Sequence, residues 1–138
     1  MTHTLEVLDR LVTATNGHDL DALVGCFAAD YVNQTPAHPP RGFRGRDQVR
    51  RNWTAIFAGV PDLTARVINT AVDGNQVWTE WEMGGTRQNG KPHAMVGVVI
   101  FGVEDEHIVS ARFYLEPVES TSGDVDAAVG RLMTAPQP

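Results

Sequence analysis

The chain has 138 residues, a mass of 15.1 kDa and a formal net charge of −6. This length suits a single domain that buries about two-thirds of its unfolded surface, and the lone Cys26 excludes an internal disulfide. The mean hydropathy of −0.20 and the interrupted apolar runs exclude a membrane span, and the acidic balance argues against a nucleic-acid partner. No signal peptide opens the chain, so we expect a cytoplasmic protein.

Three helices are predicted in the first half of the chain. Residues 5–14 repeat apolar side chains every three or four positions, and Asp19 fits the N-cap of a second helix that ends near residue 30. A third helix is predicted from 47 to 58. Between them, residues 35–45 hold three prolines and two glycines, which predicts an irregular connection.

The second half of the chain changes to the pattern of β-strands. Stretches rich in β-branched and aromatic residues are separated by turn sequences such as Asp73-Gly74 and Asn89-Gly90. The predicted strands cover residues 63–72, 76–84, 93–103 and 108–116. A short helix is predicted at 124–133. Helices followed by strands indicate an α+β fold, a cone in which three N-terminal helices pack on a curled, mostly antiparallel four-stranded meander.

Four segments carry a resemblance to a known family: DYVNQ at 30–34, VPDL at 60–63, WTEWEMGGTRQNG at 78–90 and VGVVIFGVEDEHIVSARFYLEP at 96–117. With this order of helices and strands, the chain resembles the SnoaL-like, polyketide-cyclase-like branch of the nuclear-transport-factor-two-like superfamily. The resemblance covers about residues 3–118 and leaves 119–138 as a tail. It implies the cone fold and a homodimer formed through the sheet.

The resemblance also implies a range of activities, because the superfamily includes cyclases, ketosteroid isomerases, dehydratases, epoxide hydrolases and non-catalytic binding domains. Fold alone does not choose among them. Asn33 matches a pocket asparagine of the cyclases. Phe113 stands where the cyclases carry their acid/base aspartate, and Val98 or Val99 stands where they carry a strand histidine.

Strand alternation places Arg112 and Tyr114 on one face of the last strand, and Glu80 can lie on the same face of the sheet. If that face lines a pocket, Glu80 is a candidate general base beside Arg112, and Tyr114 can donate to an oxyanion. The alternative is the outer face of the sheet, where such pairs are solvated or lie in a dimer interface. The opposite, wholly apolar face is the one that is cheaper to bury against helices, which favours the outer placement.

His38 lies in the proline-rich connection, which should pass near the mouth of the cone, so it is a candidate proton carrier. Asn33 and Tyr31 are candidate polar groups of the pocket. An exposed loop histidine without a role is the alternative for His38. His93 and His107, beside a proline and in a turn, are expected to face solvent.

Aromatic and soft apolar side chains are numerous enough to line a pocket for a hydrophobic ligand, although core and dimer packing would use the same residues. The candidate ligand-binding residues are Tyr31, Trp53, Phe57, Trp81, Met83, Val98 and Phe113. Five arginines also gather within residues 41–51, either to hold an anionic group of a substrate at the pocket mouth or as a solvated surface.

The sequence therefore predicts a protein that binds a hydrophobic, carbonyl-bearing or polycyclic small molecule. The leading hypothesis is a cofactor-free, metal-free isomerase, cyclase, dehydratase or hydrolase that uses acid/base catalysis through His38, Asn33, Arg112, Tyr114 and Glu80. The alternative is a non-catalytic ligand-binding or dimerisation module.

Overall fold

Two helices open the fold in the computed structural model, which describes residues 2–120 and 123–134. Helix α1 spans Thr2–Asn16 and helix α2 spans Leu20–Gly25. Asp19 caps α2 as the sequence predicts, because its Oδ1 accepts a hydrogen bond from the Ala22 backbone N–H at 3.2 Å. The apolar side chains of both helices join one buried core with the sheet.

Helix α2 ends earlier than predicted, because the chain is already extended in strand β1 (Phe27–Gln34). A 3-10 turn, η1 (Pro39–Arg41), and the short strand β2 (Phe43–Arg44) follow, so the expectation of a wholly irregular stretch at 35–45 was wrong. Helix α3 then spans Arg46–Gly59.

The remaining strands are β3 (Thr64–Asp73), β4 (Gln76–Thr86), β5 (Pro92–Glu104) and β6 (His107–Pro117). They form the predicted antiparallel meander. The sheet nevertheless has six strands in the order β2-β1-β6-β5-β4-β3, so the predicted number of four was wrong. The additional strands come from the first half of the chain, where β1 pairs in parallel with β6 across a long sequence separation and β2 pairs with β1.

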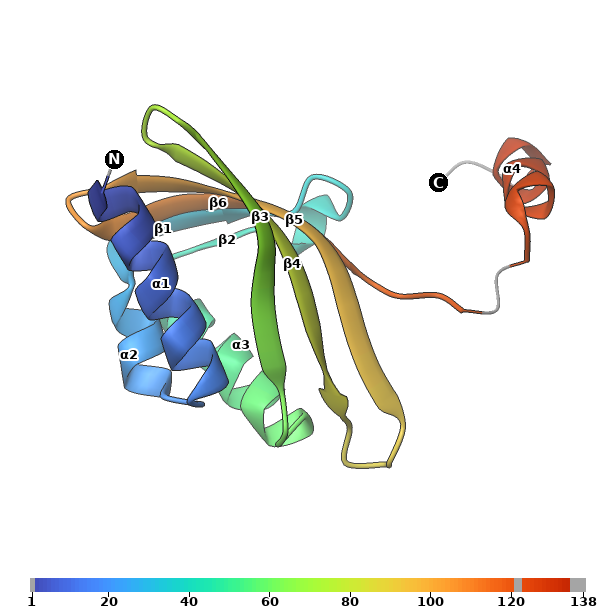
Figure 1. Ribbon diagram of the computed structural model, residues 1–138, viewed down its shortest axis with the longest axis horizontal. Helices are drawn as coiled ribbons and strands as arrows, with labels where there is room; N and C mark the ends of the chain where they lie inside the picture. Colours follow the sequence, from blue (N-terminus) through green and yellow to red (C-terminus); the bar gives the residue numbers. More distant parts are fainter. Residues whose placement is uncertain (1, 121–122, 135–138) are drawn as a thin grey trace.

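The sheet curls around the helices, which lie on its concave side (Figure 1). In the middle of β5, Gly97 has a φ of 148°, and a Cβ at this position would overlap the backbone carbonyl oxygen of Tyr114. Only glycine fits this backbone conformation and this close approach of β5 to β6.

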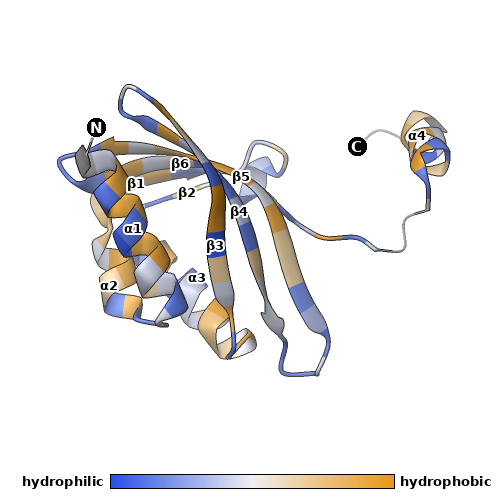
Figure 2. Cartoon of the chain, in the orientation of Figure 1, coloured by the Kyte–Doolittle hydropathy of each residue, from blue (hydrophilic) through white to orange (hydrophobic). Residues whose placement is uncertain are grey.

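Helix α4 (Val125–Thr134) follows the sheet and stands apart from the cone (Figure 1). Its apolar side chains remain exposed, with Val125 73% and Met133 76% accessible. In Figure 2 the helix is mostly coloured as hydrophobic, whereas the tip of the β4–β5 hairpin is hydrophilic. Among the helices in the described residues, none combines the length and the apolar character needed to cross a membrane.

Candidate functional site

A cavity of about 380 Å³ lies between α3 and the concave face of the sheet. This volume falls within the range of small-molecule sites. Strands and helix contribute a mainly apolar lining, which consists of Phe27, Phe43, Val49, Trp53, Ile56, Leu63, Met83, Met95, Phe113 and Leu115.

One polar cluster in this cavity comes from β1 and the residue after it. The Tyr31 hydroxyl donates a hydrogen bond to Asn33 Oδ1 at 2.7 Å, and Asn33 Nδ2 lies 3.5 Å from Thr35 Oγ1. Burial raises the pKa of Tyr31 well above its ordinary value, so the phenol stays protonated and keeps donating. Because Tyr31 occupies the carbonyl oxygen of Asn33, the amide N–H group is what Asn33 can offer a ligand.

A second amide, Asn52 of α3, lines the same cavity. Its Oδ1 accepts a hydrogen bond from Gln48 Nε2 at 2.7 Å, and Gln48 Oε1 in turn accepts from Arg51 at 2.6 Å. Within the described residues Asn52 Nδ2 donates no hydrogen bond, so this amide N–H group can donate to a ligand. The cavity therefore contains two amides whose oxygens are already engaged, an arrangement suited to a ligand oxygen that carries or develops negative charge.

His93, at the start of β5, brings a titratable ring to the cavity. Burial, and then the positive charge of Arg87, lower the pKa of His93 below its ordinary value. The ring is therefore neutral near pH 7 and can accept a proton. Arg41 of η1 is the other charged residue on the lining, and within the described part of the chain no Asp or Glu lines this cavity.

Comparison with known proteins assigns the chain to a family. A SnoaL-like domain matches residues 8–111, three-quarters of the chain. The chain belongs to the SnoaL-like family. Among curated proteins, none matches the sequence significantly.

Solved structures share the SnoaL-like fold. A candidate SnoaL-like polyketide cyclase from Jannaschia sp. CCS1 matches with a TM-score of 0.71 and 19% identity, over 99% of this chain and 94% of that one. A candidate isomerase from Bacillus subtilis matches with a TM-score of 0.74 and 17% identity, over 83% and 87% of the two chains. An LEH-like epoxide hydrolase from M. tuberculosis has a TM-score of 0.71 and 17% identity, over 83% and 84%.

Several residues that the sequence singled out line the cavity of this SnoaL-like domain. They are Tyr31, Asn33, Trp53, Met83 and Phe113. They come from four different elements of the fold, and the curl of the sheet over α3 brings them together.

Arg112, Tyr114 and Glu80 lie on the outer face, because the apolar face of each strand packs toward the helices. Glu80 and Tyr114 both pair with Val98, so β5 separates them and no pair forms between Glu80 and Arg112. Glu80 instead accepts a hydrogen bond from Asn69 Nδ2 at 2.7 Å. Val98 is on this outer face as well, away from the cavity that it was predicted to line.

His38 also lies outside the cavity lining. Its Nε2 atom is 2.8 Å from Glu116 Oε1, and the two side chains are 34% and 46% exposed. The proline-rich connection thus brings His38 to the end of β6, so the ring has a partner that the sequence did not indicate. Glu116, which carries the partner carboxylate, follows Tyr114 and Leu115 on β6.

Two predicted ligand-binding aromatics belong to the packed core. Trp81 is 2% exposed, and its Nε1 donates to Thr79 Oγ1 at 2.6 Å. Phe57 stacks on His18 with ring centroids 4.5 Å apart. Neither side chain lines the cavity, since Trp81 is buried and the half-buried Phe57 packs against His18.

Sequence reasoning missed Asn52 and the position of His93. Alternation along β5 could have found His93, since it shares a face with Met95, Val99 and Phe101, and that face is apolar. No comparable signal marks Asn52, which lies beside exposed polar positions on α3.

Proposed function

We propose that this SnoaL-like protein binds a hydrophobic, carbonyl-bearing small molecule, such as a polycyclic one, and converts it by cofactor-free acid/base catalysis. An isomerisation, cyclisation, dehydration or hydrolysis fits this description. The observation that carries the proposal is a cavity with an apolar lining that contains two oriented amide donors and one neutral imidazole.

In the proposed mechanism, the apolar lining binds the carbon skeleton and an amide N–H holds the carbonyl oxygen. Asn33 has this role, with Tyr31 as its positioning residue, and Asn52 is the second donor. As a proton leaves the substrate, negative charge builds on the oxygen and the hydrogen bonds strengthen. The neutral ring of His93 accepts the proton.

The substrate must be long enough to reach both groups. Asn33 pairs with Ala111 of β6, and Ala111 pairs with Phe101 of β5. His93 is eight residues before Phe101 on the same strand. A substrate that contacts Asn33 and His93 therefore extends along the cavity, and a conjugated system must link the proton lost at His93 to the oxygen held by Asn33. This favours a molecule of several conjugated rings over a small metabolite.

The names of the structural neighbours support a chemistry of this kind, since they include a candidate polyketide cyclase, a candidate isomerase and an epoxide hydrolase. A non-catalytic ligand-binding module is the second proposal. It is favoured by the lack of any carboxylate on the cavity lining among the described residues.

We also propose that a second copy of the chain covers the outer face of the sheet. Ile68, Trp78, Val96 and Tyr114 are between 42% and 46% exposed there, and they come from four adjacent strands. Large apolar side chains grouped on one face are typical of a protein interface.

The enzymatic proposal is tested by incubating the protein with carbonyl-bearing polycyclic compounds and following the products by mass spectrometry and chiral chromatography. With a converted compound in hand, Asn33→Ala should lower kcat about 100-fold with a small change in KM, because the lost contact is strongest in the transition state. Tyr31→Phe should have a smaller effect in the same direction.

Asn69→Ala is the matched control, because it removes an asparagine from the outer face of the same sheet. It should keep the wild-type kcat. Compounds that bind with measurable affinity and are recovered unchanged would contradict catalysis and support the binding module instead.

A further inference from the structure

A second hollow, a groove of about 400 Å³, lies at the end of the cone where the β4–β5 hairpin meets the C-terminal end of α3. We call it the mouth groove. It is lined by Ile56, Gly59, Val60, Arg87, Gln88, Asn89 and His93. Ile56 and His93 also line the interior cavity, so the two spaces adjoin at these residues.

The hairpin is fixed to α3 by contacts that do not use the Arg87 side chain. The Gln88 side chain donates to the carbonyl oxygen of Ala58 at 2.7 Å, and the Gln88 backbone N–H donates to that of Gly59 at 3.2 Å. Asp62 Oδ1 accepts from the Thr86 backbone N–H at 2.6 Å. The mouth groove is therefore held in shape before any ligand binds.

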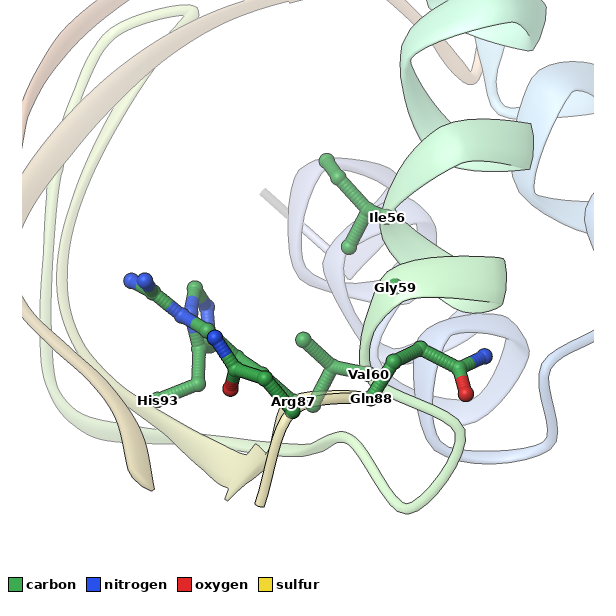
Figure 3. A pocket seen from close by; sticks show the side chains of 7 residues that line it. Ile56, Gly59, Val60, Arg87, Gln88 and His93 are labelled. Carbon is green, nitrogen blue, oxygen red and sulfur yellow. The ribbon is translucent and has the colours of Figure 1, made fainter. Parts of the chain in front are cut away.

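Arg87 points from the hairpin toward the concave side of the sheet, close to His93 (Figure 3). Its guanidinium makes no hydrogen bond or ion pair within residues 2–120 and 123–134. Most of its five N–H donors are thus available in a fork that matches a carboxylate.

Charge at the mouth is the reverse of the charge of the whole chain. The protein has a formal net charge of −6 and 17 acidic residues. In the described structure, none of these acidic residues lines the mouth groove or the interior cavity, whereas Arg87 lines the groove and Arg41 lines the cavity. An acidic protein with a cationic cavity entrance attracts anionic ligands to that entrance.

We propose that Arg87, with His93 beside it, binds the carboxylate of an apolar small molecule whose hydrocarbon part lies in the interior cavity. This inference rests on the proposed function, since it names the substrate class for the same cavity. It also orients the ligand, because the anionic end lies at the mouth and the carbonyl-bearing part of the apolar skeleton lies toward Asn33.

The Arg87 guanidinium gives the geometry of this recognition. Two parallel N–H···O bonds from one guanidinium fix the plane of a carboxylate, and the neutral imidazole of His93 can add a third donor. The apolar side chains of Ile56 and Val60 border the groove and can contact the hydrocarbon part of the ligand next to its carboxylate.

The experiment compares two fluorescent probes of nearly equal shape, 9-anthracenecarboxylate and the neutral 9-anthracenemethanol, in titrations with the full chain. We expect the wild-type protein to bind the carboxylate about tenfold more tightly than the alcohol. Arg87→Gln should remove this preference while leaving the Kd of the alcohol unchanged.

Lys91→Gln is the matched control, because it removes one positive charge from the same hairpin but at a residue outside the groove lining. It should keep the tenfold preference. Equal loss of preference in Arg87→Gln and Lys91→Gln would overturn the site and assign the effect to general charge.

The same titrations also distinguish failure of the carboxylate site from failure of the hydrophobic cavity on which the proposed function rests. If both probes bind equally to the wild-type protein, and Phe113→Ala weakens both, the cavity binds hydrophobic ligands and the carboxylate site is wrong. If neither probe binds, the hydrophobic cavity itself is contradicted, and the carboxylate site with it.

Discussion

Phe113 and Tyr114 are neighbours on β6, yet Phe113 lines the interior cavity while Tyr114 is 43% exposed on the opposite face. The same division runs through the whole sheet. On the concave side, polar groups are few and have free donors, as Asn33 does. On the outer side, charged groups pair with each other, as Arg66 does with Glu82 at 2.8 Å.

This difference shows that a rich supply of charged groups is a poor guide to the site in this fold. The outer face has more acids and bases, and several are solvated or paired with a neighbour, as Arg66 and Glu80 are, although Nε of Arg112 is buried there without a hydrogen-bond partner in the described structure. The concave face has few titratable groups, but burial alters their pKa values and an apolar lining surrounds them. Four experiments test or sharpen this division.

The largest expected effect comes from Gly97, where β5 and β6 approach closely in the middle of the curled sheet. Gly97→Ala should lower the free energy of unfolding by more than about 3 kcal/mol, because the new Cβ would overlap the Tyr114 backbone and force a rare φ. Urea unfolding followed by tryptophan fluorescence measures this loss. The control Gly25→Ala, with open space around the new Cβ, should change stability little, and an equal loss in both variants would refute the role of Gly97.

The pair Phe113→Ala and Tyr114→Ala compares the two faces at adjacent positions. Phe113 packs edge-to-face against Phe101 with ring centroids 6.4 Å apart. We expect Phe113→Ala to cost about 2–3 kcal/mol of unfolding free energy and to weaken binding of 9-anthracenemethanol at least about tenfold. Tyr114→Ala should leave that Kd unchanged. Weaker probe binding in Tyr114→Ala alone would place the ligand on the outer face.

The outer face is tested by Trp78→Glu, which puts a charge among its exposed apolar side chains. If a second copy covers this face, the dimer dissociation constant should rise by a factor that corresponds to about 2 kcal/mol, because a buried aromatic anchor is lost and a charge is desolvated. Sedimentation equilibrium measures this change. Val125→Glu, on the exposed surface of α4, should have no effect, and a wild-type protein that stays monomeric would end the dimer proposal.

The smallest effect concerns pH. The pKa of His93 is lowered by burial first and by Arg87 second, so the unfolded chain takes up this proton more readily than the folded one. As pH falls through the ordinary histidine pKa of about 6.5, the free energy of unfolding should therefore decrease, and it should level off below the folded pKa. Urea unfolding between pH 5 and 7.5 should show a shallower decrease for His93→Gln, and Arg87→Gln should reduce it in part. An unchanged slope in His93→Gln would contradict this assignment.

Local patterns in the sequence determined the helices, the meander and the division of its strands into two faces. Alternation is enforced by the pleat of each strand, so the placement of Arg112 and Tyr114 on the face opposite to Phe113 followed from their order alone, whereas the choice of the outward face did not. The alternation is interrupted at one point, because a bulge near Gly102 in the β5–β6 pairing makes Ile108 a buried residue and leaves Val109 half-buried.

Only the tertiary structure decided which of these residues form the site. The parallel pairing of β1 with β6 brings Tyr31 and Asn33 to the cavity, and the curl of the sheet brings His93 and Arg87 under the end of α3. These placements depend on contacts between residues far apart in the chain. Strand periodicity cannot encode them, because it fixes the face on which a side chain lies but not the strand or helix that lies opposite.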